Sequence, residues 1–175
     1  MTKQEVRWLV LAMLQITPGM TLLDMGCGTG SVTVEMARMN SAGQVYALEQ
    51  KPEAVALTKE NLKQFGLSNV TVLAGRGETL LEELPELDRV FIGGAGGALE
   101  EILYRLPQKM KPKGRIVITA VTLETVALAT RLLKQEPYAN VTIQQTGITR
   151  YVQRAGYTMA QAENPVTIIS AEICE

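Results

Sequence analysis

The stretch TLLDMGCGTG, residues 21–30, decides the fold. Its first half, residues 21–25, is a short and mainly apolar run, and its second half places glycine at alternate positions from Gly26 to Gly30. A segment that favours a helix follows directly, over residues 31–39. A strand, a glycine-rich turn and a helix in this order are typical of the first βα unit of nucleotide-binding α/β proteins, where glycine lets a ligand approach the backbone and the helix start offers free N–H groups.

Extended and helical segments alternate outward from this turn. A first helix is expected from a capping box at Thr2 to about Gln15. The further strands are expected at residues 44–49, 69–74, 89–92 and 115–120, and the further helices at 52–65, 79–84, 99–110 and 123–135. Alternation at this spacing implies right-handed βαβ units and a parallel sheet that is covered on both faces.

The alternation breaks near the end of the chain. Residues 141–149 and 165–171 both look extended, and no helix-length apolar pattern lies between them. We therefore expect a strand pair joined by an irregular segment, with an antiparallel last strand. No internal repeat or linker is visible, so a single domain over residues 1–175 is expected: a mostly parallel, doubly wound α/β sheet of Rossmann-like type.

Composition excludes several classes of protein. The 175 residues are 46% hydrophobic and 20% charged, with a formal net charge of −1, which suits one ordinary domain and disfavours a nucleic-acid partner held by overall charge. The chain has no histidine, which excludes Ser-His hydrolases, Cys-His proteases and histidine metal sites. With only two cysteines, Cys27 and Cys174, neither a disulfide framework nor a metal knuckle is expected, and no metal site is predicted.

The start of the chain has no signal-peptide layout. The longest apolar run, residues 8–14, is far shorter than the ~20 residues that span a bilayer. We therefore expect a cytoplasmic protein without a membrane partner and with reduced thiols.

An acid follows the second expected strand, at Glu49, 19 positions after Gly30. A carboxylate at that strand tip can accept hydrogen bonds from both ribose hydroxyls of an adenosine. A dinucleotide fingerprint would need glycine at Ser31, which disfavours a nicotinamide oxidoreductase. The alternatives at these positions are a turn that only connects strand to helix and an acid that only faces solvent.

The glycine spacing, preceded by Asp24, resembles motif I of the class I S-adenosylmethionine-dependent methyltransferases. After the fourth expected strand stands FIGGAGG, residues 91–97, in place of the Asn- or Asp-Pro-Pro-aromatic run of enzymes that methylate base amines. No Pro-Cys nucleophile for cytosine methylation is present. Residues 93–97 could form a flat platform for a large planar substrate, with Gly94 and Gly97 against it, or only a tight loop.

A more specific resemblance covers nearly the whole chain. The chain is similar to the decarboxylating cobalt-precorrin-6B (C15)-methyltransferases of cobalamin biosynthesis, which in related routes occur as one half of a precorrin-6Y methyltransferase fusion. The segments that carry this resemblance are residues 2–7, 26–30, 45–49, 91–97, 99–103, 123–125 and 163–166. It implies methyl transfer from S-adenosylmethionine to a ring-bridging carbon of a corrinoid, with loss of carbon dioxide from an acetate side chain.

The resemblance also implies a set of cofactor-binding residues: Thr2, Gly26, Cys27, Gly28, Thr29, Gly30, Glu49 and Gly77. Thr2 has a competing role as the helix cap. The family usually has an acid after the glycine that follows the third strand, but here Gly75 is followed by Arg76, which cannot accept a hydrogen bond from the adenine amine. Adenine is then read by backbone groups at Arg76 and Gly77 or by Glu78, while the Arg76 side chain stacks on the purine or faces solvent.

The implied substrate carries many carboxylates and needs cationic partners. Arg150 and Arg154 are the first candidates for bidentate contacts, against the alternative of ordinary surface arginines. Further candidates are the rings of Tyr151 and Tyr157 and the cations Lys3 and Arg7.

Without histidine, we expect catalysis mainly by positioning, and no catalytic residue is assigned. Glu124 could face the reacting centre but is interpreted as an acid that complements a helix dipole, and Met25 and Trp8 are interpreted as core. The resemblance suggests a homo-oligomer such as a tetramer. The alternatives are an RNA or other small-molecule methyltransferase on the same fold, or a noncatalytic nucleoside-binding module.

Overall fold

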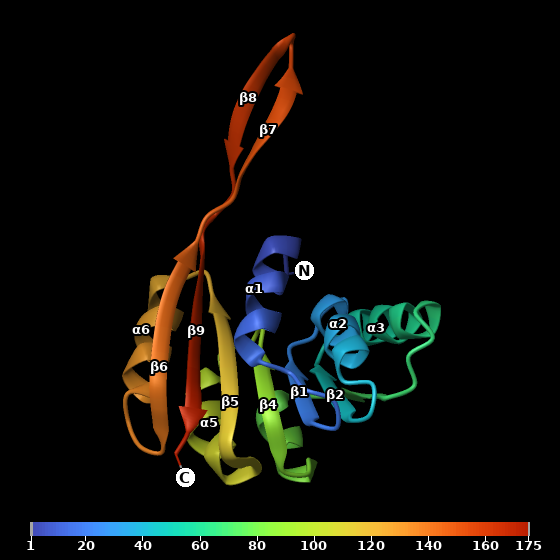
Figure 1. Ribbon diagram of the computed structural model, residues 1–175, viewed down its shortest axis with the longest axis vertical. Helices are drawn as coiled ribbons and strands as arrows, with labels where there is room; N and C mark the ends of the chain where they lie inside the picture. The colour runs from blue at the N-terminus through green and yellow to red at the C-terminus, as the bar shows by residue number, and fades with distance from the viewer. Residues whose placement is uncertain (1, 175) are drawn as a thin grey trace.

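The computed structural model describes residues 2–174, which form one seven-stranded sheet, helices on its two faces and a projecting hairpin (Figure 1). The strands of the sheet are β1 (Thr21–Met25), β2 (Gln44–Glu49), β3 (Val70–Ala74), β4 (Leu87–Ile92), β5 (Met110–Ala120), β6 (Tyr138–Thr146) and β9 (Val166–Ile173). The helices are α1 (Gln4–Leu14), α2 (Ser31–Met39), α3 (Pro52–Gln64), α4 (Gly77–Leu80), α5 (Leu99–Arg105) and α6 (Leu123–Leu133), with 3₁₀ turns η1 (Leu81–Glu83) and η2 (Leu106–Lys109).

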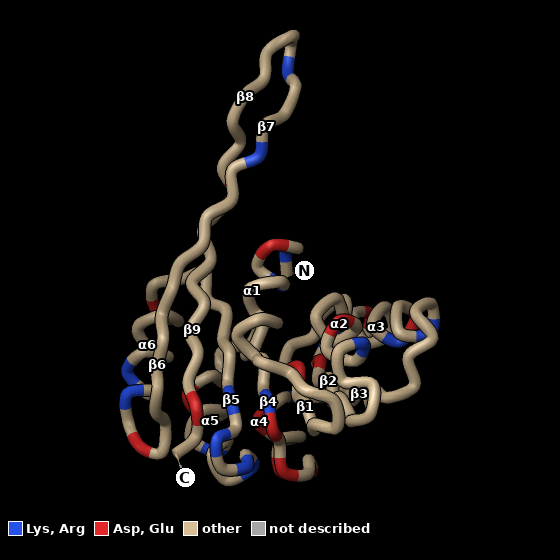
Figure 2. The backbone as a smooth tube through the Cα atoms, viewed as in Figure 1, with Lys and Arg blue, Asp and Glu red and all other residues tan. Residues whose placement is uncertain are grey.

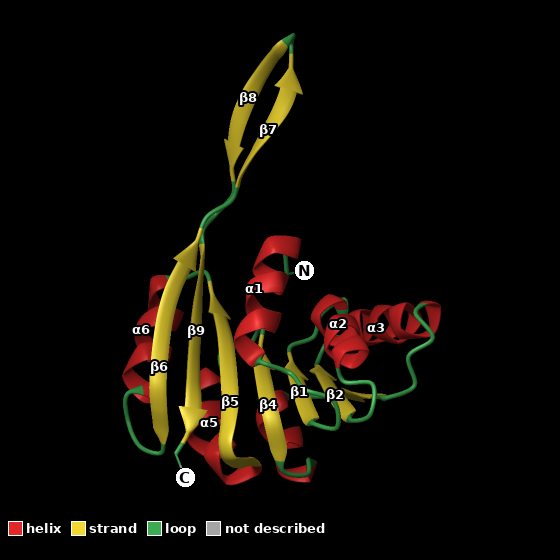
Figure 3. Cartoon of the chain, viewed as in Figure 1, coloured by secondary structure: helices red, strands yellow, loops and turns green. Residues whose placement is uncertain are grey.

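The strand order is β3-β2-β1-β4-β5-β9-β6. Figure 3 shows the part of this order from β2 to β6. β1 to β5 pair in parallel, and β9 runs antiparallel to both β5 and β6. This confirms the expected mostly parallel sheet with an antiparallel last strand. The chain proceeds from β1 to one side and from β4 to the other, so the order reverses between these two strands. Ligands of such sheets bind outside the carboxyl ends of the strands at that reversal.

Both faces of the central strands are buried, and for this reason the sequences of these strands are nearly continuous apolar runs. Leu22 packs with the buried faces of α1 and α2, whereas its neighbour Leu23 packs on the other face with α5 and α6. Phe91 of β4 is 1% exposed, and burying a side chain of this size contributes about 1.5–3 kcal/mol. The core therefore holds β1 and β4, and with them the glycine turn, in a fixed position.

Two expectations for the first helix are wrong. The helix begins at Gln4 with Lys3 as N-cap and without a side-chain cap, so Thr2 does not close a capping box. Trp8 is 57% exposed, because the buried face of α1 is formed by residues at helical spacing around Val6, Val10 and Leu14, and Trp8 lies off this face.

Other boundaries differ from the expected ones by a few residues. The expected helix over 99–110 divides into α5 and the 3₁₀ turn η2, since Pro107 cannot donate a helical hydrogen bond. The strand expected from residue 115 begins earlier, at Met110, and it includes Lys113 with φ of 60°. Neither difference moves the carboxyl ends of the strands.

The expectation of an irregular segment between the last strands is also wrong. Strands β7 (Thr149–Arg154) and β8 (Tyr157–Ala162) form an antiparallel hairpin that projects from the edge of the sheet (Figure 1). Ala155 and Gly156 both have positive φ, 48° and 82°, as a two-residue type I′ turn requires. Sequence inspection missed the turn because alanine, unlike asparagine or aspartate, gives no signal for positive φ.

Candidate cofactor and substrate site

The glycine turn lies at the carboxyl end of β1, against the turn that follows β4. A Cβ atom on Gly26 would clash with the Gly94 carbonyl oxygen, so the two backbones touch and no larger residue fits. A Cβ atom on Gly28, which has φ of 58°, would meet no other atom within 4 Å, so one side of the turn is open to a ligand. The sequence motif thus serves both close backbone packing and ligand access.

The Glu49 carboxylate is fixed at the tip of β2. One oxygen, Oε2, accepts a hydrogen bond from the Gly28 N–H at 3.0 Å, and the other, Oε1, accepts one from the Lys51 N–H at 2.9 Å. A carboxylate oxygen has a second lone pair, so both oxygens can still accept from a ligand hydroxyl. This confirms the strand-tip position that the sequence predicted for Glu49 and makes the acid more than a solvated surface group.

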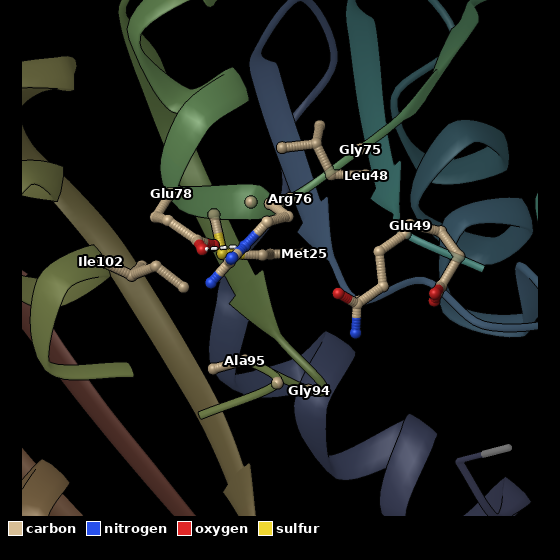
Figure 4. A pocket seen from close by; sticks show the side chains of 13 residues that line it. Met25, Leu48, Glu49, Gly75, Arg76, Glu78, Gly94, Ala95 and Ile102 are labelled. Carbon is tan, nitrogen blue, oxygen red and sulfur yellow. Dashed lines mark hydrogen bonds and ion pairs between the residues drawn. The ribbon is translucent and has the colours of Figure 1, made fainter. Parts of the chain in front are cut away.

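A narrow pocket joins the tips of β1, β2 and β3 to the platform Gly93–Gly97 (Figure 4). Its apolar wall is formed by Met25, Leu48, Ala95 and Ile102. Glu49 and Glu78 both line it, with the backbone of Gly75 to Gly77 between them along the chain. A narrow slot with one apolar wall and a carboxylate toward each end suits a flat heterocycle joined to a sugar.

Arg76 and Glu78 form an ion pair at this pocket, where Arg76 Nε donates to Glu78 Oε1 at 2.5 Å (Figure 4). The Arg76 side chain is 71% exposed and that of Glu78 only 10%. The pKa of Glu78 is lowered by a hydrogen bond from its own backbone N–H and by Arg76. An ionised Glu78 is thus available as an acceptor at this pocket, which Arg76 also lines although its side chain is mostly exposed.

A second cavity, of about 410 Å³, lies on the other side of the glycine turn. Its lining residues are Thr2, Lys3, Val6, Gly26, Cys27, Gly28, Gly93, Thr119, Val121, Asn164 and Val166. Thr2 thus faces the cavity that the turn opens into, although it does not cap the helix. Thr29 instead lines a shallow depression with Glu49 and Lys51.

A third cavity, of about 320 Å³, lies between the platform and the start of α6. It shares Gly93, Thr119 and Val121 with the second cavity, so the two are contiguous. Gly94 and Gly97 leave open space beside their backbones, which gives the platform a surface without side chains. Glu124 lines this cavity and is exposed, in the first turn of α6, where it also complements the helix dipole.

Arg150 is engaged in ion pairs. It donates to Glu5 Oε1 at 2.6 Å and to Glu163 Oε1 at 3.1 Å, and Lys3 Nζ lies 2.7 Å from Glu163 Oε2. This network, which we call the hairpin-root clamp (Lys3, Glu5, Arg150 and Glu163), ties the base of the hairpin to the start of α1. Arg150 is therefore already paired with two carboxylates.

The other expected substrate contacts lie outside the three cavities. Arg154, Tyr151 and Tyr157 lie on the hairpin, where Arg154 donates to the Gln161 amide oxygen at 3.4 Å and both tyrosines are largely exposed. Arg7 lies 4.0 Å from Glu35. The structure thus brings the expected cofactor residues to these cavities, except Gly30, which is buried against Thr58. Of the expected substrate cations, Lys3 lines the second cavity, whereas Arg7, Arg150 and Arg154 line none of the three.

Two further groups lie behind the glycine turn. Asp24 is fully buried and accepts from the Thr33 hydroxyl at 2.5 Å, while its Oδ1 has no partner, and burial raises its pKa to about 7. Burial also raises the pKa of the Cys27 thiol to about 12, so that Cys27 contributes its backbone and not a thiolate. Met25 is 2% exposed, as expected for a core residue, and it also forms the floor of the narrow pocket.

Sequence inspection missed several residues of the site. Gln50 and Thr119 line its cavities but belong to no motif, and Asn164 lies in a segment of the family resemblance but was not assigned to the site. Thr58 and Asn61 of α3 bond to the glycine turn, and their spacing of three places them on one helix face, which was the only available signal.

No group of three or more His, Cys, Asp or Glu that could hold a metal ion occurs within residues 2–174. Over the same residues, no helix has the length and apolar character that a membrane crossing needs.

The sheet order and the strand-tip site define the class, a Rossmann-like methyltransferase fold. Solved structures agree: a precorrin-6Y C5,15-methyltransferase from Geobacter metallireducens is 37% identical with a TM-score of 0.92, over 98% of this chain and 90% of that one. A precorrin 8w decarboxylase from Methanobacterium thermoautotrophicum is 37% identical with a TM-score of 0.89, over 97% and 90%.

Residues 1–172 match the family model described as precorrin methyltransferase domain. A protein of Pyrobaculum calidifontis named "Probable cobalt-precorrin-6B C(15)-methyltransferase (decarboxylating)" is 41% identical, over 98% of this chain and 88% of its own length. A protein of Saccharolobus solfataricus with the same name is 37% identical, again over 98% and 88%. The chain belongs to the precorrin methyltransferase family.

Proposed function

We propose that this chain is an S-adenosylmethionine-dependent C-methyltransferase that acts on cobalt-precorrin-6B at C15 and releases carbon dioxide from an acetate side chain. The observation that carries the proposal is the Glu49 carboxylate, held by two backbone N–H groups beside an open glycine turn, in a chain of the precorrin methyltransferase family. The substrate is that of the named relatives. We further propose that one methyltransferase domain spans residues 1–175.

The residues present fit the proposed cofactor. Glu49 accepts from the ribose hydroxyls, and Glu78, with the backbone of Arg76 and Gly77, faces adenine over the apolar wall of the narrow pocket. Gly26, Cys27, Gly28 and Thr29 present the side of the turn against which the cofactor lies, and Thr2 contacts its amino-acid end from the second cavity. Gly30 is buried against Thr58 and completes the turn without touching the cofactor. When bound, S-adenosylmethionine supplies an activated methyl group.

The chain's own residues orient the two reactants. The open backbone of Gly94 and Gly97 lets a planar macrocycle lie on the platform, next to the two contiguous cavities. The apolar side chain of Val121, which lines both cavities and is 73% exposed, covers the ring from water when it binds. Positioning of this kind supplies several kcal/mol of a barrier, on the order of 7–11 in favourable cases.

Peripheral carboxylates of the substrate still need cations. We propose that Arg150 exchanges one of its two carboxylate partners for a substrate carboxylate and that Arg154 makes a further contact from the hairpin. Charged positions of both signs are interspersed along the chain (Figure 2), and nothing in this arrangement favours a nucleic-acid partner.

We also propose that the chain forms a homo-oligomer, such as a tetramer, through the hairpin. A two-stranded hairpin is marginally stable alone, and this one exposes Tyr151, Tyr157 and Met159 by 73%, 74% and 52%. A second copy of the chain would cover these side chains. A cytoplasmic location, where thiols stay reduced, fits the free cysteines Cys27 and Cys174.

The proposed function is tested by an assay of catalytic turnover. The protein is incubated with S-adenosylmethionine labelled in its methyl group and with cobalt-precorrin-6B, and the corrinoid product is followed by mass spectrometry. We expect a product that has gained the labelled methyl group and lost one carbon dioxide. Methylation without loss of carbon dioxide, or no change in the corrinoid, would contradict the proposal.

A further inference from the structure

Two side chains of α3 hold the carbonyl groups of the glycine turn. Thr58 Oγ1 donates to the Gly28 carbonyl oxygen at 2.9 Å, and Asn61 Nδ2 donates to the Thr29 carbonyl oxygen at 2.9 Å. Thr58 is fully buried and lines none of the cavities described above. Thr58 therefore acts on the turn from behind and has no direct access to a ligand, and Asn61, although partly exposed, lines none of these cavities either.

The hydroxyl of Thr58 donates to an acceptor outside its own helix. A threonine within a helix commonly bonds to a carbonyl of its own preceding turn. Here the hydroxyl leaves its helix and bonds across the sequence to Gly28. The contact is close because Gly30 has no side chain: a Cβ atom there would stand 2.8 Å from Thr58 Cγ2.

The residue held in this way also holds Glu49. The Gly28 N–H donates to Glu49 Oε2 at 3.0 Å, and the Gly28 carbonyl accepts from Thr58. A single residue of the turn thus connects a buried hydroxyl on α3 to the carboxylate at the tip of β2. Asn61 fixes the next carbonyl of the turn, so that two successive carbonyls point toward α3.

We propose that Thr58 and Asn61 are positioning residues for the cofactor site, which set the orientation of the Gly28 and Thr29 backbone and, through Gly28, of the Glu49 carboxylate. The inference rests on the proposed function, since it takes the ligand of this site to be S-adenosylmethionine. Holding both carbonyls toward α3 keeps their oxygens away from the electron-rich ribose oxygens. It also fixes Glu49 before the ligand arrives, which lowers the cost of ordering the site on binding.

The test measures the affinity for S-adenosylhomocysteine by calorimetry, together with the midpoint of thermal unfolding of each variant. Thr58→Val keeps the shape of the side chain and removes the donor, and we expect it to weaken binding about 3- to 10-fold. Thr58→Ser restores the hydroxyl and should bind like the parent protein. Lys59→Gln and Glu60→Gln, exposed on the same helix, are the matched controls and should leave the affinity unchanged.

A double-mutant cycle separates positioning from a general loss of stability. If Thr58 acts through Glu49, the Thr58→Val change costs less affinity in a Glu49→Gln background than in the parent protein. Equal costs in both backgrounds would overturn the proposal, as would unchanged binding by Thr58→Val with only a lower unfolding temperature. Should Thr58→Val fail to fold, Asn61→Leu, at a partly exposed position, is measured in the same cycle with the same two readings.

The proposed function fails in a different way. If the parent protein itself binds no S-adenosylhomocysteine, the choice of cofactor is wrong. If the parent protein binds and the α3 variants bind equally well, only the positioning role is wrong.

Discussion

At the scale of single residues, the site consists of carboxylate acceptors whose positions are set by neighbouring groups of the chain. Glu49 is fixed by two N–H groups, and Glu78 is kept ionised by its backbone and by Arg76. Glu49 could be predicted because a strand-tip acid at a set distance from a glycine turn is a sequence pattern. The ion pair between Arg76 and Glu78 could not be predicted, because the side-chain directions around the start of α4 are not encoded in a spacing.

The Arg76–Glu78 pair leads to a prediction about adenine. Arg76→Ala should change the affinity for S-adenosylhomocysteine by less than about threefold, because Arg76 is mostly exposed. Glu78→Gln should weaken it about 10-fold, because the amide presents one acceptor in place of two. Both are measured by equilibrium dialysis with labelled ligand. A greater loss for Arg76→Ala than for Glu78→Gln would show that the arginine itself contacts the purine.

The raised pKa of Asp24 predicts how the stability of the fold changes with pH. Burial raises its pKa from 3.8 to about 7, so the folded state binds this proton more tightly than the unfolded state. The resulting stability is fully present below pH ~4 and is lost as the pH rises to about 7, with a slope of at most about 1.4 kcal/mol per pH unit. In urea unfolding at a series of pH values, Asp24→Asn should remove this slope between pH 4 and 7. An identical slope in the variant would refute the assignment to Asp24.

At the scale of elements, the hairpin-root clamp connects parts that are far apart in the sequence. Lys3 and Glu5 come from the start of the chain, and Arg150 and Glu163 flank the hairpin near its end. The alternation of strands and helices was predictable because apolar periodicity is local. The hairpin-root clamp was not predictable, since it depends on the hairpin, and the turn of that hairpin, Ala155-Gly156, carries no clear sequence signal. For the same reason Arg150 was predicted as a free cation.

The clamp predicts how firmly the hairpin root is held. Glu163→Gln removes the charge that Lys3 and Arg150 share, so backbone amides over residues 147–166 should exchange with deuterium faster than in the parent protein. Glu100→Gln, which loses the exposed pair with Arg131, is the control and should not affect that segment. The clamp also depends on pH. Lys3 and Arg150 lower the pKa of Glu163, and a backbone hydrogen bond together with Arg150 lowers the pKa of Glu5. The ion pairs of the clamp are therefore intact above pH ~4.5 and weaken as the pH falls below it. Unchanged exchange in Glu163→Gln would contradict this account.

At the scale of the whole molecule, the sheet order follows from the chain order of βα units and the handedness of their connections. This is why the fold class and the strand-tip site were predictable from residues 21–49. The cavities were not predictable from the sequence, because their lining residues come together only through the sheet and the return of β9. The second cavity, for example, is lined by Thr2, Gly93, Thr119 and Asn164.

The hairpin leads to a prediction about assembly. Light scattering of the full chain should give a mass of more than one copy, and Tyr151→Ser with Met159→Ser should reduce it, because both side chains are exposed on the hairpin. A matched control, Tyr104→Ser, removes an exposed ring elsewhere and should leave the mass unchanged. A parent protein that is monomeric would refute the proposed oligomer.

The central claim is that an adenosyl cofactor occupies the tips of β1 and β2 with its sugar bound by Glu49. Calorimetric titration with S-adenosylhomocysteine tests it most directly, in the parent protein and in Glu49→Gln. We predict one site per chain that S-adenosylmethionine competes for, and about 10- to 100-fold weaker binding in the variant, because hydrogen bonds to a charged group are lost. No heat with the parent protein, or equal affinity in Glu49→Gln, would contradict the claim.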